Sequence, residues 1–157
     1  MKKSGTRKQR QAEEEKFNSA RQLEIMGELP GAITAYEQIL KKNPLHIDAT
    51  SRLLILYRKM KNIPKEISLL SDAIASHEAH VESSQRAWIM EHEDIAERSR
   101  PLAKMLGLLN AKELPFYEHE VVEKWKKRLE AAKKRCDKKK EKQKTNIKKQ
   151  GKIVNKR

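Results

Sequence analysis

The chain has 157 residues, with 36 Lys or Arg against 22 Asp or Glu, a net charge of +14 and only 4% aromatic residues. No run of about 18 apolar residues occurs and the charged N-terminus has no apolar stretch, so we expect neither a membrane span nor a secretory leader. The single cysteine excludes internal disulfides, and these features together predict a protein of the reducing cytoplasm.

The charge and the residue types predict an all-α fold with basic ends. Residues 126–157 hold sixteen basic and three acidic residues, a net charge of +13, whereas residues 17–125 carry −2 and residues 1–16 carry +3. Gly, Pro, Thr and Val are few and alternating apolar runs are absent, which disfavours strands and permits long helices. We expect a nearly neutral helical body between two basic ends.

Apolar residues at helical spacing predict four short helices within residues 13–79. Their boundaries are marked by residues typical of helix ends and turns: Gly27, Pro30, Asn43, Pro44, Asp48, Asn62 and Pro64. Asp48 is expected to cap the third helix. Because the turns are short, consecutive helices should lie antiparallel.

The apolar pattern repeats at an interval of 34 residues. This interval separates Ile33 from Ile67 and Tyr36 from Leu70, and it is typical of the helix–turn–helix unit called the tetratricopeptide repeat (TPR). The segment 26–44 resembles that family, with its turn glycine, small residue, aromatic residue and closing proline at family spacing: Gly27, Ala32, Tyr36 and Pro44. We expect Tyr36 to be buried between the hairpins and Ala32 to lie at a close helix contact.

The second unit, residues 47–79, departs from the family pattern. Other residues replace the turn glycine, two small residues and the closing proline: Lys61, Leu54, Glu66 and Glu78. The resemblance therefore covers residues 13–79, as one clear and one degenerate repeat. Each repeat needs neighbours to cover its apolar face, so the rest of the chain is expected to supply that cover.

The resemblance implies a peptide-binding groove lined by the first helix of each repeat. The groove positions of this chain form two sets of four: Glu14, Phe17, Arg21, Glu24, Asp48, Ser51, Ile55 and Arg58. Six of them are the candidate binding residues: Phe17, Arg21, Glu24, Ser51, Ile55 and Arg58. Phe17 and Arg21 stand where some members of the family clamp a terminal carboxylate with Lys and Asn, so that clamp is not expected. Two alternatives stay open: Phe17 and Ile55 pack under the C-terminal helices, or the last helix fills the groove.

The second half of the chain predicts three more helical segments. One runs from His80 to Ser99, the next begins at Pro101, and the last begins at Pro115. In the last segment a narrow apolar seam should pack on the preceding helices and end at the cysteine: Val122, Trp125, Leu129, Ala132 and Cys136. The predicted organisation is a basic N-terminal arm, the TPR-like repeats, a helical extension and a lysine-rich tail: 1–12, 13–79, 80–136 and 137–157.

The lysine-rich tail has two interpretations. It is either a solvated, frayed or disordered end, or an electrostatic anchor for RNA, DNA or an acidic protein. The candidate polyanion-binding residues are all lysines: Lys138, Lys139, Lys140, Lys142, Lys144, Lys148 and Lys149. No aromatic residue lies in the tail to stack on bases, so any nucleic-acid contact should be phosphate-directed and independent of sequence.

No arrangement of residues predicts catalysis, a cofactor or a bound metal. His77 and His80 are three residues apart, whereas a zinc-protease helix needs histidines four apart, so we expect them at an exposed helix junction. His92 is expected to be hydrogen-bonded and half-buried, and Cys136 to be a small packing residue of the seam. The acidic residues near His92 should form a solvated helix face: Glu91, Glu93 and Asp94.

These observations predict a non-catalytic protein-interaction module, an adaptor or assembly factor whose partner is an unknown protein or peptide. The alternative is a ribosome- or nucleic-acid-associated protein that binds through its basic tail. The two hypotheses differ in whether residues 137–157 are needed for binding.

Overall fold

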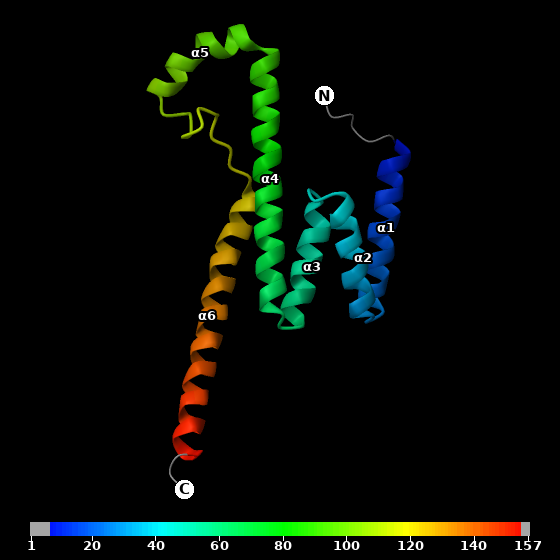
Figure 1. Cartoon of the computed structure of the whole chain (residues 1–157). Helices are drawn as coiled ribbons and strands as arrows, with labels where there is room; N and C mark the ends of the chain where they lie inside the picture. The colour runs from blue at the N-terminus through cyan, green and yellow to red at the C-terminus, as the bar shows by residue number, and fades with distance from the viewer. Residues whose placement is uncertain (1–6, 155–157) are drawn as a thin grey trace.

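The structure is a computed structural model that describes the backbone of residues 7–154 and the side chains of residues 7–141. Within this part of the chain lie six α-helices: α1 (Arg7–Ile25), α2 (Leu29–Lys42), α3 (Ile47–Lys59), α4 (Ile63–Glu91), α5 (Glu93–Met105) and α6 (Glu120–Val154) (Figure 1). No strand is present among these residues, only an isolated bridge between Leu109 and Pro115. The predicted all-α class is confirmed. None of the described helices has both the length and the apolar character that crossing a bilayer requires.

The first four helices form two antiparallel hairpins whose turns share one backbone geometry (Figure 1). Gly27, between α1 and α2, has a φ of +83°, and Lys61, between α3 and α4, has a φ of +53°. In each turn the next N–H donates to a carbonyl in the preceding helix at 2.9 Å: Glu28 to Leu23, and Asn62 to Tyr57. Glycine adopts this left-handed conformation freely, whereas Lys61 adopts it with steric strain.

Helix α3 is capped by a histidine rather than by the predicted aspartate. The Nδ1 atom of His46 accepts a hydrogen bond from the Ala49 N–H at 3.2 Å. Asp48 lies inside the first helical turn, where its carboxylate faces the positive end of the helix dipole. The expected cap is therefore wrong by two residues, because His46 already supplies the acceptor that the free helical N–H groups need.

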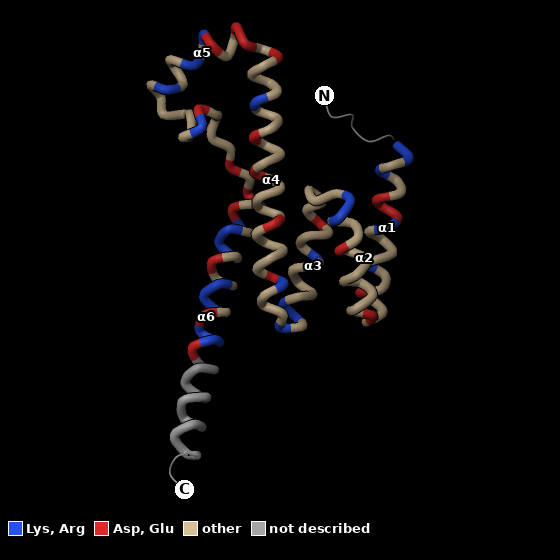
Figure 2. Tube along the Cα trace, in the orientation of Figure 1, with Lys and Arg blue, Asp and Glu red and all other residues tan. Residues whose placement is uncertain are grey.

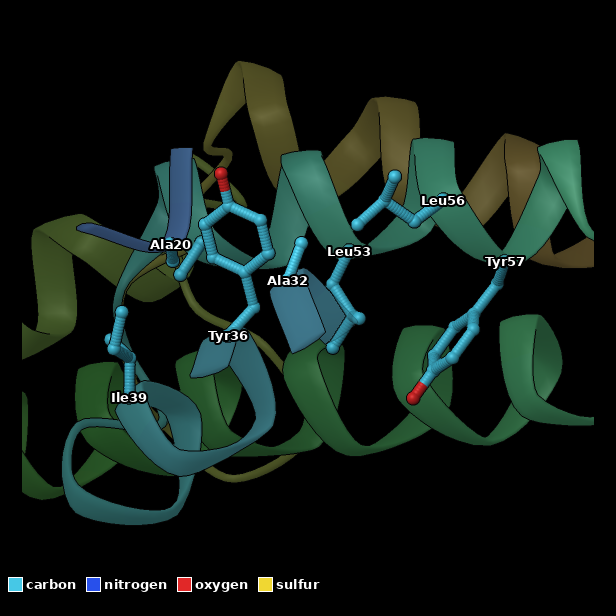
Figure 3. Packing of buried hydrophobic residues seen from close by; sticks show 8 residues of the cluster. Ala20, Ala32, Tyr36, Ile39, Leu53, Leu56 and Tyr57 are labelled. Carbon is cyan, nitrogen blue, oxygen red and sulfur yellow. The ribbon is translucent and has the colours of Figure 1, made fainter. Parts of the chain in front are cut away.

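The first core lies between α1, α2 and α3, and part of it is drawn in Figure 3. Its buried residues are mostly small or aliphatic: Ala20, Ala32, Tyr36, Ile39, Ala49, Leu53, Leu56 and Tyr57. Ala32 and Tyr36 are both fully buried, so their predicted burial is confirmed. The alanines let the helix backbones approach closely, and the Tyr36 ring fills the space that remains.

The second core joins α3 and the first half of α4 to the first half of α6, which runs antiparallel to α4 there (Figure 1). Its buried residues come from all three helices: Leu54, Leu70, Ala73, Ile74, Val122 and Trp125. Ala132 is also fully buried, Leu129 packs against this core, and Cys136 is half-buried. Residues 137–141 are exposed. The predicted seam is confirmed, and its packing ends at Cys136 as far as side chains are described.

Helix α4 is longer than the sequence pattern predicts. It runs unbroken to Glu91, so the predicted helix from His80 to Ser99 is wrong. No Gly or Pro follows its first turn, and α6 covers one of its sides, so nothing stops the helix where the second repeat was expected to end. The helix ends at His92, whose backbone N–H donates to the Trp88 carbonyl at 3.0 Å.

Contrary to prediction, neither proline of the second half begins a helix. Pro101 lies inside α5, where it removes a single backbone N–H from a helix of 13 residues. Pro115 lies in the connection before α6, which begins only at Glu120. There its carbonyl accepts a hydrogen bond from Nε2 of Gln85 in α4 at 3.0 Å, which holds the connection against α4.

Candidate interaction surfaces

Phe17, a predicted groove residue of α1, belongs to the core between the first three helices. Its ring stacks on His46 with centroids 5.2 Å apart and is tilted against Tyr36 at 5.8 Å. These partners come from α2 and the start of α3, so Phe17 does not pack under the C-terminal helices. Its first role is to hold the hairpins together.

Glu24, a second predicted groove residue, is buried in an ion pair between α1 and α3. Its carboxylate accepts hydrogen bonds from Nη2 of Arg52 at 2.8 Å and from the Tyr36 hydroxyl at 3.2 Å, and its side chain is 6% exposed. Burial, followed by the nearby Glu24 carboxylate, raises the pKa of Tyr36. The hydrogen bond from Arg52 also raises the pKa of that guanidinium. Glu24 therefore joins the two hairpins from inside.

The other four candidate groove residues are exposed or half-buried. Arg21, Ile55 and Arg58 are exposed, and Ser51 is half-buried. Helix α6 leaves these side chains open, and its polar contact with α3 is made elsewhere, by Nη2 of Arg128 on the Leu54 carbonyl at 3.0 Å. Of the six candidates, two therefore stabilise the hairpins and four remain at least partly accessible.

A buried acid–base cluster, which the sequence pattern did not predict, attaches α6 to α4. Glu66 is fully buried, and its carboxylate accepts from Nε of Arg128 at 3.0 Å and lies 3.3 Å from Nη2 of Arg135. Glu66 occupies the place of a small residue in the repeat pattern, and the two arginines lie seven residues apart beside the seam of α6. Those two departures from an apolar interface were the signal that could have predicted the cluster.

The most apolar accessible surface lies at the far end of α4, on α5 and on the connection to α6. We call residues 88–117 the apolar lobe. Of thirteen large hydrophobic side chains that are exposed among the described residues, nine belong to it: Trp88, Met90, Ile95, Leu102, Met105, Leu106, Leu108, Phe116 and Tyr117. Figure 1 shows α5 bent away from the end of α4, apart from the first three helices.

Polar contacts and one buried leucine fix the connection of the apolar lobe to the body. Asn110 accepts backbone hydrogen bonds from Lys112 at 2.8 Å and Leu114 at 3.2 Å, which shapes the turn. Leu114 is buried, and Lys112 pairs with Glu82 of α4 at 2.6 Å. The lobe therefore has an ordered framework while its large apolar side chains face outward.

Three histidines gather where α4 meets the start of α6. The His77 ring lies 5.4 Å from the edge-on Trp125 ring and 6.4 Å from the His119 ring. Nε2 of His77 and Nδ1 of His80 are buried and have no hydrogen-bond partner. Burial first, and then His119 and His80, lower the pKa of His77. The expectation of an exposed helix junction is wrong, because α4 continues through both residues.

His92 and the acidic residues around it lie where the sequence predicts. His92 is half-buried, with its Nδ1 atom 3.0 Å from the Trp88 carbonyl, as expected. Glu91, Glu93 and Asp94 are exposed, as expected. Among residues 7–141 no set of three or more His, Cys, Asp or Glu side chains is placed to hold a metal ion.

The structure describes the side chains of only three of the seven candidate lysines on α6. Lys138, Lys139 and Lys140 are exposed, and Figure 2 shows acidic residues interspersed among the basic ones over the whole coloured part of α6. The other four candidates lie outside the residues whose side chains are described: Lys142, Lys144, Lys148 and Lys149.

Known proteins give no further identification of the chain. No model of a protein family, no curated protein and no solved structure matches it.

Proposed function

We propose that this protein is a non-catalytic protein–protein interaction module, an adaptor or assembly factor built on TPR-like hairpins. The observation that carries the proposal is the apolar lobe, which holds nine of the thirteen exposed large hydrophobic side chains of the described residues. Monomeric proteins normally expose large apolar side chains singly, and a concentration of them in one segment is typical of surfaces that a partner covers.

The TPR-like character of the hairpins is supported by what recurs in them. The left-handed turn residues Gly27 and Lys61 stand one 34-residue interval apart, and Ala32 is buried at the helix contact. In this proposal the hairpins form a rigid base for the apolar lobe. The accessible groove positions form a second, more polar surface for a peptide: Arg21, Ser51, Ile55 and Arg58.

Affinity capture from a native lysate tests the role of the apolar lobe. The bait with Leu102→Glu and Met105→Glu should lose the proteins that the unaltered bait retains, because charges in an apolar contact must be desolvated. The matched control is Ile25→Glu with Met26→Glu, which changes two equally exposed apolar residues outside the lobe. If all three baits retain the same proteins, the lobe is not the binding surface.

A second candidate function, polyanion binding by α6, is favoured by three consecutive exposed lysines, Lys138 to Lys140. Lysines bind phosphates as point charges, and each contact releases condensed counterions. Replacing all three with Gln should reduce the salt dependence of binding to random-sequence RNA by a log–log slope of about 2, at about 0.7 per lost contact. A matched control replaces the exposed Lys41, Lys42 and Lys59 with Gln. Equal effects of the two triple variants would contradict a tail-specific site.

A further inference from the structure

We propose that the part of α6 beyond Cys136 binds double-stranded DNA by entering its major groove, chiefly through contacts with the phosphates. The proposal rests on the second candidate function, polyanion binding by α6, and names the polyanion. We call residues 137–154 the projecting segment of α6.

The projecting segment begins as a helix with no apolar side to dock on protein. Figure 1 shows α6 running past the turn between α3 and α4, beyond the ends of the first four helices. The seam of α6 includes Ala132 and Cys136, and at the same spacing its next position is Lys139. Residues 137–141 are all charged and exposed. Contact with an apolar surface would therefore bury lysines without partners, which is unfavourable.

The three consecutive lysines of the projecting segment cover one broad side of the helix. Successive residues of an α-helix leave its axis about 100° apart, so Lys138 and Lys140 stand on either side of Lys139. Asp137 and Glu141 lie two residues from Lys139 in either direction, and both therefore fall on the opposite side. The helix presents cations over roughly 200° of its circumference and carboxylates on its back.

A ligand with an anionic wall on each side of the helix fits this distribution. The major groove of B-form DNA is about 12 Å wide and admits an α-helix, whose diameter with side chains is about 10–12 Å. With Lys139 toward the floor of the groove, Lys138 and Lys140 are directed to the phosphates of the two strands. Asp137 and Glu141 then face solvent. An acidic protein surface would meet only one side of the helix, so the charges favour DNA.

The form of the duplex and the length of the helix narrow the partner further. The major groove of A-form RNA is too narrow for this mode of binding, because side chains do not reach into it. At about 1.5 Å per residue the projecting segment is about 27 Å long, which matches about eight base pairs of DNA. The sequence places five more lysines on this helical backbone after Glu141: Lys142, Lys144, Lys148, Lys149 and Lys152.

Titration of the full chain with labelled nucleic acids of mixed sequence tests the choice of ligand. The probes are duplex DNA, duplex RNA and single-stranded RNA, each about 20 nucleotides long. At about 0.1 M salt, duplex DNA should bind at least about tenfold more tightly than either RNA. Methyl green, which occupies the major groove, should compete with the protein, and netropsin, which occupies the minor groove, should not.

The salt dependence of duplex binding tests the lysines. Replacing Lys138, Lys139 and Lys140 with Gln should reduce the log–log salt slope by about 2.7, at about 0.9 per lost phosphate contact. The matched control replaces Lys41 and Lys42 with Gln, two exposed lysines in the last turn of α2, and should leave the slope unchanged. Equal slopes for the triple variant and the unaltered chain would overturn the proposal.

An exchange of charges at constant net charge tests their placement. Lys139→Glu combined with Glu141→Lys moves one cation from the groove side of the helix to its back. The exchange should weaken duplex binding about tenfold at about 0.1 M salt, because one phosphate contact is lost. Equal binding would overturn the proposal, since a tail that acts through net charge alone does not distinguish the two chains. Equal helix content by circular dichroism identifies folded variants.

The same titrations separate this proposal from the candidate function on which it rests. If either RNA binds as tightly as duplex DNA, entry into the major groove fails while polyanion binding by α6 stands. If none of the three probes binds even at low salt, both fail. Capture of an acidic protein that depends on Lys138 to Lys140 would in that case assign the projecting segment to a protein partner.

Discussion

Glu66 is the single residue through which α4 holds both arginines of α6. Glu66→Ala should lower the free energy of unfolding by about 3 kcal/mol, because it leaves the partly covered guanidinium groups of Arg128 and Arg135, 26% and 40% exposed, without the buried carboxylate that holds them. Urea unfolding followed by circular dichroism measures the change. The control is Glu78→Ala, which removes an exposed pair with Lys126 and should cost less than about 1 kcal/mol. Equal losses in the two variants would show that burial gives Glu66 no special role.

Ala32 is a fully buried residue of the first core. Ala32→Leu should destabilise the fold by about 1–3 kcal/mol, because the fully buried position gives three added carbon atoms no space without displacing a helix. Ala87→Leu, at an exposed site on α4, should change the stability by no more than about 0.5 kcal/mol. An unchanged melting temperature for Ala32→Leu would contradict the close contact of α1 and α2.

Residue spacing predicted which helix face a side chain occupies, but not what covers that face. Phe17, Arg21 and Glu24 share one predicted surface, yet only Arg21 is left accessible. Glu24 is buried by Arg52, which lies 28 residues away in sequence, and no local pattern of α1 indicates that partner. The burial of Tyr36 and Ala32 was predictable because both sit at fixed places in the 34-residue interval.

At the scale of elements, the turn between α3 and α4 is strained by a side chain. Lys61→Gly should raise the free energy of unfolding by about 1 kcal/mol, because Lys61 has a positive φ that glycine adopts freely. Gly27→Ala at the equivalent turn should lower it by a similar amount, although a Cβ atom there meets no neighbour within 4 Å. Thermal unfolding of the two variants measures both changes in stability. Changes of the same sign would contradict the common turn geometry.

The contact between α4 and α6 should weaken in acid. The pKa of His77 is lowered from 6.5 in the folded chain by burial, His119 and His80, so the unfolded chain takes up the proton more readily. The stabilisation by neutral His77 is complete above about pH 6.5 and is lost as the pH falls below it, by at most about 1.4 kcal/mol per pH unit. His77→Gln should therefore flatten the pH dependence of urea unfolding between about pH 7.5 and pH 5.5. An identical pH dependence in the variant would contradict this assignment.

Between α1 and α4 the element boundaries followed the Gly, Pro and Asn residues of the sequence, as at Gly27 and Asn62. They did not follow it where punctuation is absent or misleading. The end of α4 at His92 depends on hydrogen bonding to Trp88 and is not marked by Gly or Pro. Pro101 lies inside α5 and therefore does not mark the start of a helix. Proline excludes one backbone hydrogen bond, and a short exposed helix can form without it.

At the scale of the whole molecule, Trp125 should control whether α6 is docked. Trp125→Ala should cost about 3–5 kcal/mol, because a nearly fully buried indole leaves a large cavity. The matched control is Trp88→Ala, since Trp88 is 49% exposed and its removal should cost about 1 kcal/mol. Fluorescence of Trp125 in a Trp88→Phe background reports docking directly. Emission like that of free tryptophan in water would contradict the buried seam.

The helical class and the seam of α6 could be predicted from the sequence because each rests on spacing within one segment. The apolar lobe could not. Its framework joins residues about 30 positions apart, as in the contacts of Gln85 with Pro115 and of Glu82 with Lys112. The exposure of its large side chains depends on how the helices pack in the folded chain. From sequence alone, the same leucines would be predicted to lie in the core.

The position of α6 after the lobe has a consequence for synthesis of the protein. The first hairpins close through neighbouring segments, whereas Glu66 meets Arg128 across 62 residues of chain. During translation the apolar side of α4, with Leu70 and Ile74, therefore emerges long before its cover exists. Nascent chains that stop short of Glu120 should bind a hydrophobic dye or a holdase chaperone, and chains extended past Cys136 should release it. Docking of α6 is thus the step that ends the exposure of this side of α4 during synthesis.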